Sequence, residues 1–99
     1  MMRQDRQRLD KWLWFARFVK SRTLAAKLVS DGFVRVNGQR AETPAKAVAV
    51  GDILTVAVAR TTAVVRVEAL GTRRGPAPEA RQLYSDLGRD DGPAGHPYP

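Results

Sequence analysis

The chain has 99 residues, of which 43% are hydrophobic, and it contains no cysteine. A chain of this length buries one modest core and leaves no room for a separate catalytic domain, and the lack of cysteine excludes disulfides, thiolate catalysis and cysteine-rich zinc sites. No apolar run approaches the roughly 18 residues of a membrane span, and the first residues lack the hydrophobic region of a signal peptide, so we expect a cytoplasmic protein without a membrane partner.

The formal net charge of +7 belongs to the first half of the chain. Residues 1–46 carry eleven of the seventeen lysines and arginines but only four of the ten acids, whereas residues 47–99 carry six of each sign. Charge concentrated in this way creates a positive field over one surface, which attracts polyanions and speeds their encounter. Nucleic acid is therefore the leading candidate partner.

Two short helices are expected at the start of the folded region. Apolar residues recur at helical spacing from Leu9 to Ala16, which predicts a helix over about residues 10–18. A second helix begins after Ser21, a good N-cap residue, and ends at Gly32, which tolerates the left-handed backbone that terminates helices. Because the link between them is short, the two helices form a corner.

Antiparallel strands are expected next. Residues 33–36 alternate between outward and inward positions and lead into Asn37-Gly38, the strongest short hairpin signal. Residues 53–58 are rich in β-branched side chains and predict a strand, which we expect to pair with a strand over residues 63–70 through a loop at 59–62.

The C-terminal region is expected to form a connector, a helix and a tail. Beyond Gly71 a proline-containing connector leads into a helix that places Ala80, Leu83, Tyr84 and Leu87 on one stripe. From Gly88 onward the sequence lacks periodicity, so we expect disorder. The predicted organisation is a flexible N-terminus (1–7), one domain (8–70), a connector with the C-terminal helix (71–87) and a disordered tail (88–99).

A basic surface is predicted around the helical corner and the hairpin. Phosphate binding requires hydrogen-bond donors and positive charge, which arginine, lysine and the free backbone N–H groups at a helix start all supply. Basic residues of the two helices avoid the apolar stripes, and a tight turn lets a sugar-phosphate backbone approach closely. The candidates for one shared surface are Lys11, Arg17, Lys20, Ser21, Arg22, Thr23, Lys27, Arg35, Asn37, Gly38, Gln39 and Arg40.

Three aromatic residues near the corner have two interpretations. Trp14, Phe15 and Phe18 fall partly off the main apolar stripe. Such rings either stack on nucleic-acid bases or pack against the sheet and the last helix. We favour packing for them.

Signals for an enzyme are weak. The sole histidine, His96, lies in the predicted tail, and no nucleophile elbow, phosphate-binding loop, dinucleotide fingerprint or metal-ligand spacing occurs. The acids occupy positions typical of caps, turns and exposed strand faces. We therefore predict no catalytic residue, no metal and no cofactor.

Between residues 8 and 58, short motifs follow one another in a fixed order: Arg8-Leu9-Asp10, Ser21-Arg22-x-x-Ala25, Gly32-x-Val34-x-Val36-Asn37-Gly38 and Gly51-Asp52-x-Leu54. Together they resemble the signature of the S4-type RNA-binding domain, also called the alpha-L motif. The resemblance implies an α+β, S4-like fold in which two short N-terminal helices pack on a small antiparallel sheet and present a basic surface to structured RNA, here followed by the C-terminal helix.

A longer set of motifs extends through about residue 87: Arg8-Leu9-Asp10-Lys11-Trp12-Leu13-Trp14, Ala16-Arg17-Phe18, Asn37-Gly38-Gln39-Arg40, and Arg73-Arg74-Gly75-Pro76-Ala77 followed by Glu79-Ala80 and Leu83-Tyr84. It is similar to the heat-shock protein fifteen family. That resemblance implies a ribosome-associated protein that binds large-subunit ribosomal RNA in the rescue of subunits holding a nascent chain on transfer RNA. By position, it implies that the RNA-facing surface contains or is oriented by Arg8, Asp10, Lys11, Arg17, Ser21, Arg22, Asn37 and Gly38.

The family's better-known members continue into a long basic tail, whereas this chain has a glycine- and proline-rich end after Gly88. Four interpretations stay open at this point. The first is an RNA-binding protein without catalysis, monomeric by default, with ribosomal RNA as its partner and transfer RNA as a second candidate. The others are a helix-turn-helix-like DNA-binding protein, an accessory RNA-binding subunit of an RNA-modifying enzyme, and a protein that adheres to acidic lipids.

Overall fold

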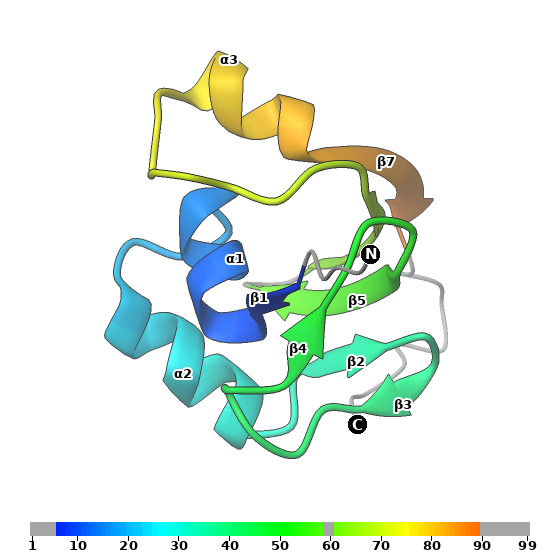
Figure 1. The fold of residues 1–99 in the computed structure, drawn as a ribbon. Helices are drawn as coiled ribbons and strands as arrows, with labels where there is room; N and C mark the ends of the chain where they lie inside the picture. Colours follow the sequence, from blue (N-terminus) through cyan, green and yellow to red (C-terminus); the bar gives the residue numbers. More distant parts are fainter. Residues whose placement is uncertain (1–5, 59–60, 90–99) are drawn as a thin grey trace.

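The computed structural model describes residues 6–58 and 61–89 and places two helices against one face of a five-stranded antiparallel sheet (Figure 1). The helices are α1 (Leu9–Phe15) and α2 (Arg22–Ser30). The strands lie in the order β3 (Gln39–Arg40), β2 (Val34–Val36), β5 (Ile53–Val58), β6 (Thr61–Val67) and β7 (Tyr84–Arg89). A separate two-stranded pairing joins β1 (Gln7–Arg8) to β4 (Ala47–Val48). The predicted α+β, S4-like fold class is confirmed.

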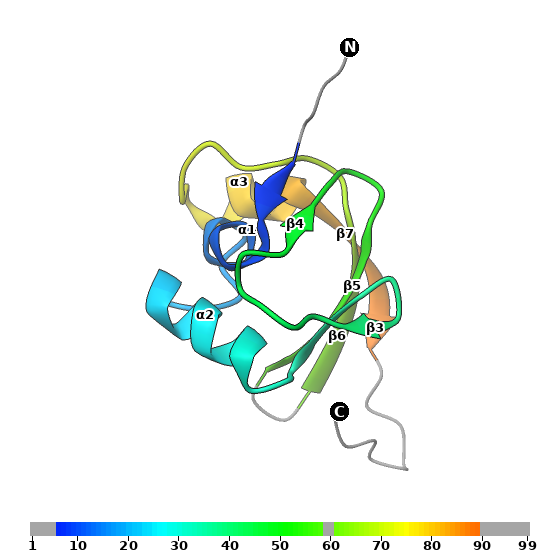
Figure 2. The ribbon, with the colours of Figure 1, turned by 60° about the horizontal axis from the view of Figure 1, so that its bottom comes forward.

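The core lies between the helices and the inner face of the curved sheet (Figure 2). Alternate residues of a strand face opposite sides, so β5 and β6 each direct a row of aliphatic side chains toward the helices. Trp12 of α1 is fully buried, and its indole N–H donates to the carbonyl of Ala69 at 3.0 Å. The rings of Phe18 and Tyr84 lie 6.1 and 6.3 Å from the Trp12 ring, so one tryptophan joins the helical corner to the last strand.

Helix α1 is shorter than the sequence predicts. It ends at Phe15, because Arg17 adopts a left-handed backbone with φ of +65°. The N–H of Arg17 then donates to the carbonyl of Trp14, and the N–H of Phe18 donates to that of Leu13, which together close the helix. The apolar spacing continues to residue 18, but the backbone turns at residue 17, so the expected helix over 10–18 is wrong at its end.

The predicted ends of α2 and the predicted hairpin are confirmed. The Ser21 hydroxyl oxygen accepts a hydrogen bond from the N–H of Leu24, and Gly32 follows the helix with φ of +89°. Asn37 and Gly38 have φ values of +53° and +85° and connect β2 to β3. Positive φ at both central residues is the geometry that two-residue hairpin turns require.

The pairing of β5 with β6 is also confirmed, but with different bounds. Strand β6 begins at Thr61 and ends at Val67, so it starts earlier and stops earlier than the predicted strand over 63–70. Residues 59 and 60 of the predicted loop lie outside the described residues.

The C-terminal helix is much shorter than predicted. A single turn, α3 (Ala77–Ala80), continues into the 3-10 turn η1 (Arg81–Leu83), and the chain then extends as β7 along the edge of β6. Tyr84 and Leu87, expected on a helical stripe, belong to this strand. A free sheet edge offers backbone partners that a short isolated helix lacks, and this tertiary pairing overrides the local pattern. Gly88 and Arg89, expected in the tail, are strand residues, and residues 90–99 lie outside the described part of the chain.

The N-terminal strand is held in place by Gln7. Its side-chain amide donates to the carbonyl of Gly71 at 2.9 Å, and its side-chain oxygen accepts the N–H of Gly71 at 3.0 Å. Gln7 is therefore an ordered strand residue rather than part of a flexible end, and residues 1–5 of the predicted flexible segment lie outside the described residues.

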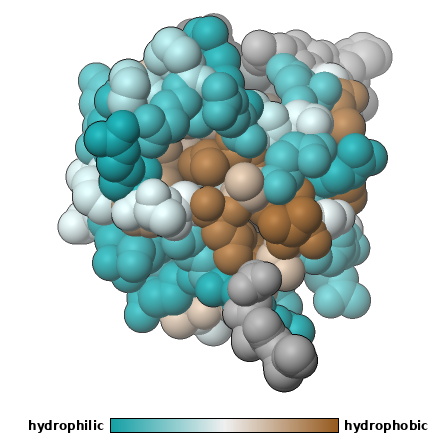
Figure 3. All heavy atoms as spheres, turned by 45° about the horizontal axis from the view of Figure 1, so that its top comes forward, coloured by the Kyte–Doolittle hydropathy of each residue, from teal (hydrophilic) through white to brown (hydrophobic). Residues whose placement is uncertain are grey.

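The surface around α3 is mostly hydrophilic, with hydrophobic residues gathered in one area (Figure 3). Over residues 6–58 and 61–89, no helix combines the length and the apolar character needed to cross a membrane. The large hydrophobic side chains that are exposed in this part of the chain belong to Leu24, Phe33, Val50 and Leu87.

Candidate nucleic-acid interface

A buried carboxylate holds two arginines at the point where β1 enters α1. Asp10 is 3% exposed, and its two oxygens accept hydrogen bonds from Nε and Nη2 of Arg8 at 3.1 and 3.0 Å. Nη2 of Arg22, at the start of α2, lies 3.8 Å from the same carboxylate. The hydrogen bonds to Asp10 raise the pKa of the Arg8 guanidinium above its ordinary value.

The outer parts of these guanidinium groups face water. The side chains of Arg8 and Arg22 are 51% and 43% exposed, whereas that of Asp10 is 5% exposed. A guanidinium carries five N–H donors, so each arginine keeps donors beyond those used on Asp10. One carboxylate therefore orients the Arg8 guanidinium by two hydrogen bonds and holds the Arg22 guanidinium nearby as an ion pair, which leaves exposed donors that phosphate oxygens can accept.

The start of α2 extends this surface. Lys20 and Thr23 are exposed beside Arg22, and the backbone N–H groups of the first helical turn carry the positive end of the helix dipole. Ser21 has a structural role here, because its side-chain oxygen caps the helix. We name the group formed by Arg8, Asp10, Lys20, Arg22 and Thr23 the corner cluster.

Helix α1 carries an aromatic pair, Trp14 and the buried Phe15, close to Lys11. The Lys11 ammonium lies 5.6 Å from the centre of the Phe15 ring, and the ring of Trp14 stacks on Phe15 at 5.5 Å. Phe15 is only 5% exposed, and Phe18 stacks in the core, so the predicted packing of these two rings is confirmed. Trp14 is half-buried and keeps part of its ring at the surface.

Arg17 anchors the connector between β6 and α3. Its Nε donates to the carbonyl of Gly75 at 2.6 Å. In the opposite direction, the guanidinium of Arg74 in the connector donates hydrogen bonds to the carbonyls of Trp14 and Val19, each at 3.2 Å. Arg17, predicted at the RNA-facing surface, thus makes a structural contact, and the role of Arg74 has no local signal in the sequence because these contacts join residues about sixty positions apart.

The turn between β2 and β3 is hydrogen-bonded to the start of β5, the other strand that pairs with β2. The Asn37 amide donates to Asp52 at 3.2 Å, and its side-chain oxygen accepts the N–H of Ile53 at 2.9 Å. Nη1 of Arg35 donates to the carbonyl of Gly38 at 3.3 Å. Three of the predicted turn residues are thus engaged in holding the turn itself.

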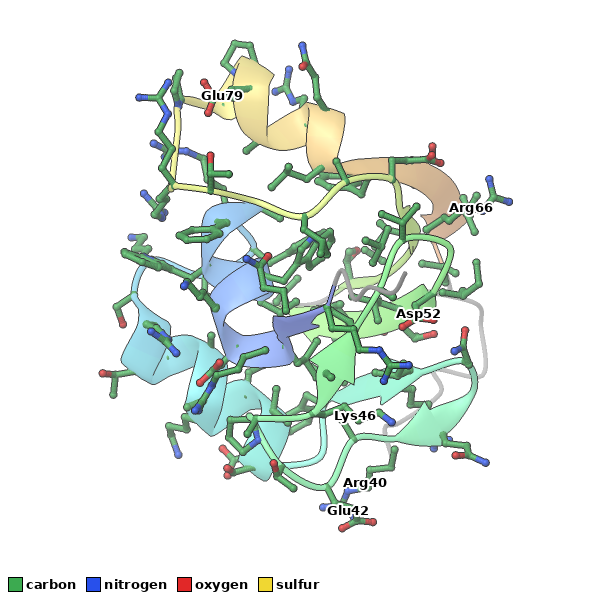
Figure 4. All side chains as sticks on the ribbon, in the orientation of Figure 1. Arg40, Glu42, Lys46, Asp52, Arg66 and Glu79 are labelled. Carbon is green, nitrogen blue, oxygen red and sulfur yellow. The ribbon has the colours of Figure 1, made fainter. Side chains whose placement is uncertain are left out.

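The predicted basic residues do not all share one face. Val34 and Val36 point into the core, so Arg35 between them projects from the sheet face opposite the helices. Lys27 pairs with Asp31 at 3.1 Å near the end of α2, and the Arg40 guanidinium lies against Gly32 at the same end. Figure 4 shows Arg40 beside Glu42 at one edge of the molecule, with Gln39 its neighbour in β3. The fold therefore gathers the corner cluster together and leaves Arg35 and the hairpin apart from it.

Known proteins share the fold and much of the sequence of this chain. The S4 domain family matches residues 7–54, which span β1 to the start of β5 and contain the whole corner cluster. The solved trimeric heat shock protein 15 of Vibrio cholerae is 43% identical and superimposes with a TM-score of 0.79, covering 84% of this chain and 83% of that one. Heat shock protein 15 of Escherichia coli K12 is 44% identical over 79 residues, which are 80% of this chain and 59% of that protein. Small ribosomal subunit protein uS4 of Xanthobacter autotrophicus is 40% identical over 72 residues, covering 71% of this chain and 35% of that protein.

The fold and the corner cluster thus define an S4-domain protein, the class of RNA-binding domain that the motifs predict. Within that class, the chain belongs to the heat shock protein 15 family. It spans about three fifths of the length of the curated relatives that it matches first.

Proposed function

We propose that the chain binds structured ribosomal RNA through the corner cluster, without catalysing a reaction. The observation that carries this proposal is the buried Asp10, which accepts two hydrogen bonds from the exposed Arg8 guanidinium and lies 3.8 Å from the exposed guanidinium of Arg22 at the start of α2. Preorganised donors lose less conformational entropy on binding than free side chains, so this arrangement favours a ligand with closely spaced anionic oxygens. A phosphodiester backbone supplies such oxygens.

Selectivity would come from RNA shape. The deep, narrow major groove of an A-form helix resists reading by side chains, so phosphate contacts hold the RNA while its folded shape and unpaired nucleotides select the site. The membership in the heat shock protein 15 family and the similarity to a small ribosomal subunit protein support a ribosomal partner. We further propose that the bound RNA is that of the large subunit and that the protein is cytoplasmic. Its role would be in the rescue of subunits that hold a nascent chain on transfer RNA.

Titration of a large-subunit ribosomal RNA fragment at several salt concentrations tests this function. If about five phosphates are neutralised, the slope of log K against log salt is on the order of −3.5 to −4.5. The double variant Lys20→Ala/Arg22→Ala removes two cations of the corner cluster and should weaken binding and flatten that slope by roughly 1.4 to 1.8. Arg8 still holds Asp10 in this variant, so the fold should remain intact.

A matched control removes the same charge elsewhere. Arg66 and Arg81 are exposed and lie outside the S4-matched segment, and the double variant Arg66→Ala/Arg81→Ala should keep the wild-type slope. Equal losses of RNA affinity in the two double variants would show that total charge, rather than the corner cluster, controls binding. Competition with duplex DNA and transfer RNA, and co-sedimentation with separated ribosomal subunits, measure which nucleic acid is preferred.

The oligomeric state of the protein is also part of the proposal. The Vibrio cholerae relative was solved as a trimer, whereas we propose a monomer for this chain when it is bound to RNA. Analytical ultracentrifugation of the protein alone and of its RNA complex measures the number of copies directly. A complex with several copies of the chain per RNA would overturn the monomer.

A further inference from the structure

An apolar groove opens between the link that joins α1 to α2, the outer face of α2 and the end of β5, and Lys20 of the corner cluster lines it. Its volume is about 480 Å³, which lies within the roughly 300–1,000 Å³ of small-molecule sites. Three side chains, Lys20, Lys27 and Asp31, form its polar rim. The apolar lining consists of Phe18, Val19, Leu24, Leu28, Phe33 and Val58.

The lining exposes large hydrophobic side chains that the core does not use. Leu24 is 47% exposed and Phe33 is 37% exposed, although α2 buries Ala25 and Val29 on its core-facing side. Leu28 follows Leu24 by one helical turn and is partly buried, so the two leucines form one strip along the helix. Phe33 lies three residues beyond the end of α2, and its N–H donates to the carbonyl of Leu28.

The charges at the rim indicate which kind of ligand suits this groove. Lys20, a member of the corner cluster, lines it two residues before α2 begins, and Lys27 lines it seven residues farther along the chain, within α2. Lys27 is paired with Asp31, whereas Lys20 belongs to the corner cluster and lies two residues before Arg22 in the chain. A ligand suited to both features has an anionic part at Lys20 and a flat apolar part inside the groove.

A nucleotide has both parts. We propose that the groove accepts one unpaired nucleobase of the RNA held by the corner cluster, with the base against Phe33 and Leu24 and its phosphate at Lys20. This inference rests on the proposed RNA binding and adds where an unpaired base is bound. Stacking on an aromatic side chain tolerates any base, so the groove selects an extruded nucleotide rather than a particular sequence.

Two RNA hairpins of equal length and charge test the proposal, one fully paired and one with a single bulged uridine. The wild-type protein should bind the bulged hairpin more tightly. Phe33→Ala should weaken binding of the bulged hairpin by roughly 5- to 150-fold, the range for loss of one stacked base, and should leave binding of the paired hairpin unchanged. The salt slope should be the same in the variant and the wild type, because stacking neutralises no phosphate.

Leu24→Ala provides a second variant that should fold, because Leu24 is half-exposed and alanine is a strong helix former. Its matched control is Leu87→Ala, since Leu87 is 45% exposed on β7 and does not line the groove. The first variant should lose part of the preference for the bulged hairpin, and the control should keep all of it. In addition, 5-iodouridine at the bulge should photo-crosslink to a peptide that contains Phe33.

Several outcomes would overturn the proposal. Wild-type protein that binds both hairpins equally, or a Phe33→Ala variant that keeps the preference, would exclude a base in the groove while leaving RNA binding itself in place. If the Phe33→Ala or Leu24→Ala variant kept its RNA binding but changed its sedimentation mass, the groove would be assigned to contacts between copies of the chain. Wild-type protein that binds neither these hairpins nor the ribosomal RNA fragment would instead refute the proposed function.

Discussion

Replacement of Asn37 tests how the β2–β3 turn is held in place. Its side chain makes two hydrogen bonds, one to Asp52 at 3.2 Å and one from the N–H of Ile53 at 2.9 Å, and its φ is +53°. Asn37→Gly removes both hydrogen bonds and keeps the backbone relaxed. Asn37→Ala removes the same hydrogen bonds and also forces a side chain with no compensating contact into the left-handed region.

The structure sets the size of both effects. A net hydrogen bond contributes about 0.5–1.5 kcal/mol, and because Asn37 is exposed, its two bonds lie near the low end, about 1–2 kcal/mol together. The left-handed backbone of a non-glycine residue adds roughly 1–2 kcal/mol in Asn37→Ala. In a domain of this size, each 1 kcal/mol lowers Tm by about 4–8 °C. The expected order of stability is therefore wild type, then Asn37→Gly, then Asn37→Ala.

Urea unfolding followed by circular dichroism measures these differences, with Gln39→Ala as the control. Gln39 is the exposed neighbour in β3, and its replacement should change the free energy of unfolding by less than about 0.5 kcal/mol. An Asn37→Ala variant at least as stable as Asn37→Gly would refute the backbone argument. An Asn37→Gly variant with wild-type stability but weakened RNA binding would show that Asn37 contacts RNA directly rather than fixing the turn.

Two further predictions concern the connector between β6 and α3. Arg17→Ala should be less stable than Arg17→Gly by about 1 kcal/mol, because both lose the hydrogen bond to Gly75 and only alanine is strained at a φ of +65°; equal free energies of unfolding would contradict this. Hydrogen bonds from Arg73 lower the pKa of Glu79, so the pair stabilises the fold above the ordinary pKa of a glutamate, and that contribution disappears as the pH falls through the lowered pKa. A carboxyl NMR titration should give a lower pKa for Glu79 in the wild type than in Arg73→Ala, and identical values would remove the pair as the cause.

Features that depend on neighbouring residues were predicted correctly from the sequence. Ser21 caps α2, Gly32 ends it, and Asn37-Gly38 forms the hairpin turn, because each depends on the backbone preference or side-chain reach of a few neighbouring residues. The family motifs added the S4-like fold. Charge composition located the basic half of the chain, since net charge needs no knowledge of contacts.

The strand β7 and the end of α1 depend on contacts that no local pattern contains. Residues 84–87 fit a helical stripe, but the free edge of β6 captures them as a strand. Likewise, Arg17 adopts its left-handed backbone where its guanidinium reaches Gly75, 58 positions away.

The arrangement of the binding surface was also decided by tertiary structure. The positions of Asp10 and Arg22 in the sequence do not reveal that the buried carboxylate lies 3.8 Å from the arginine of the next helix, or that Arg35 faces the other side of the sheet. Sequence by itself determined the charges, the turn residues and the family of this protein, because these are properties of residue types and short motifs. Which charges meet, and which apolar side chains remain open to water beside them, is determined only when distant segments pack, since packing selects among many arrangements that local preferences allow equally.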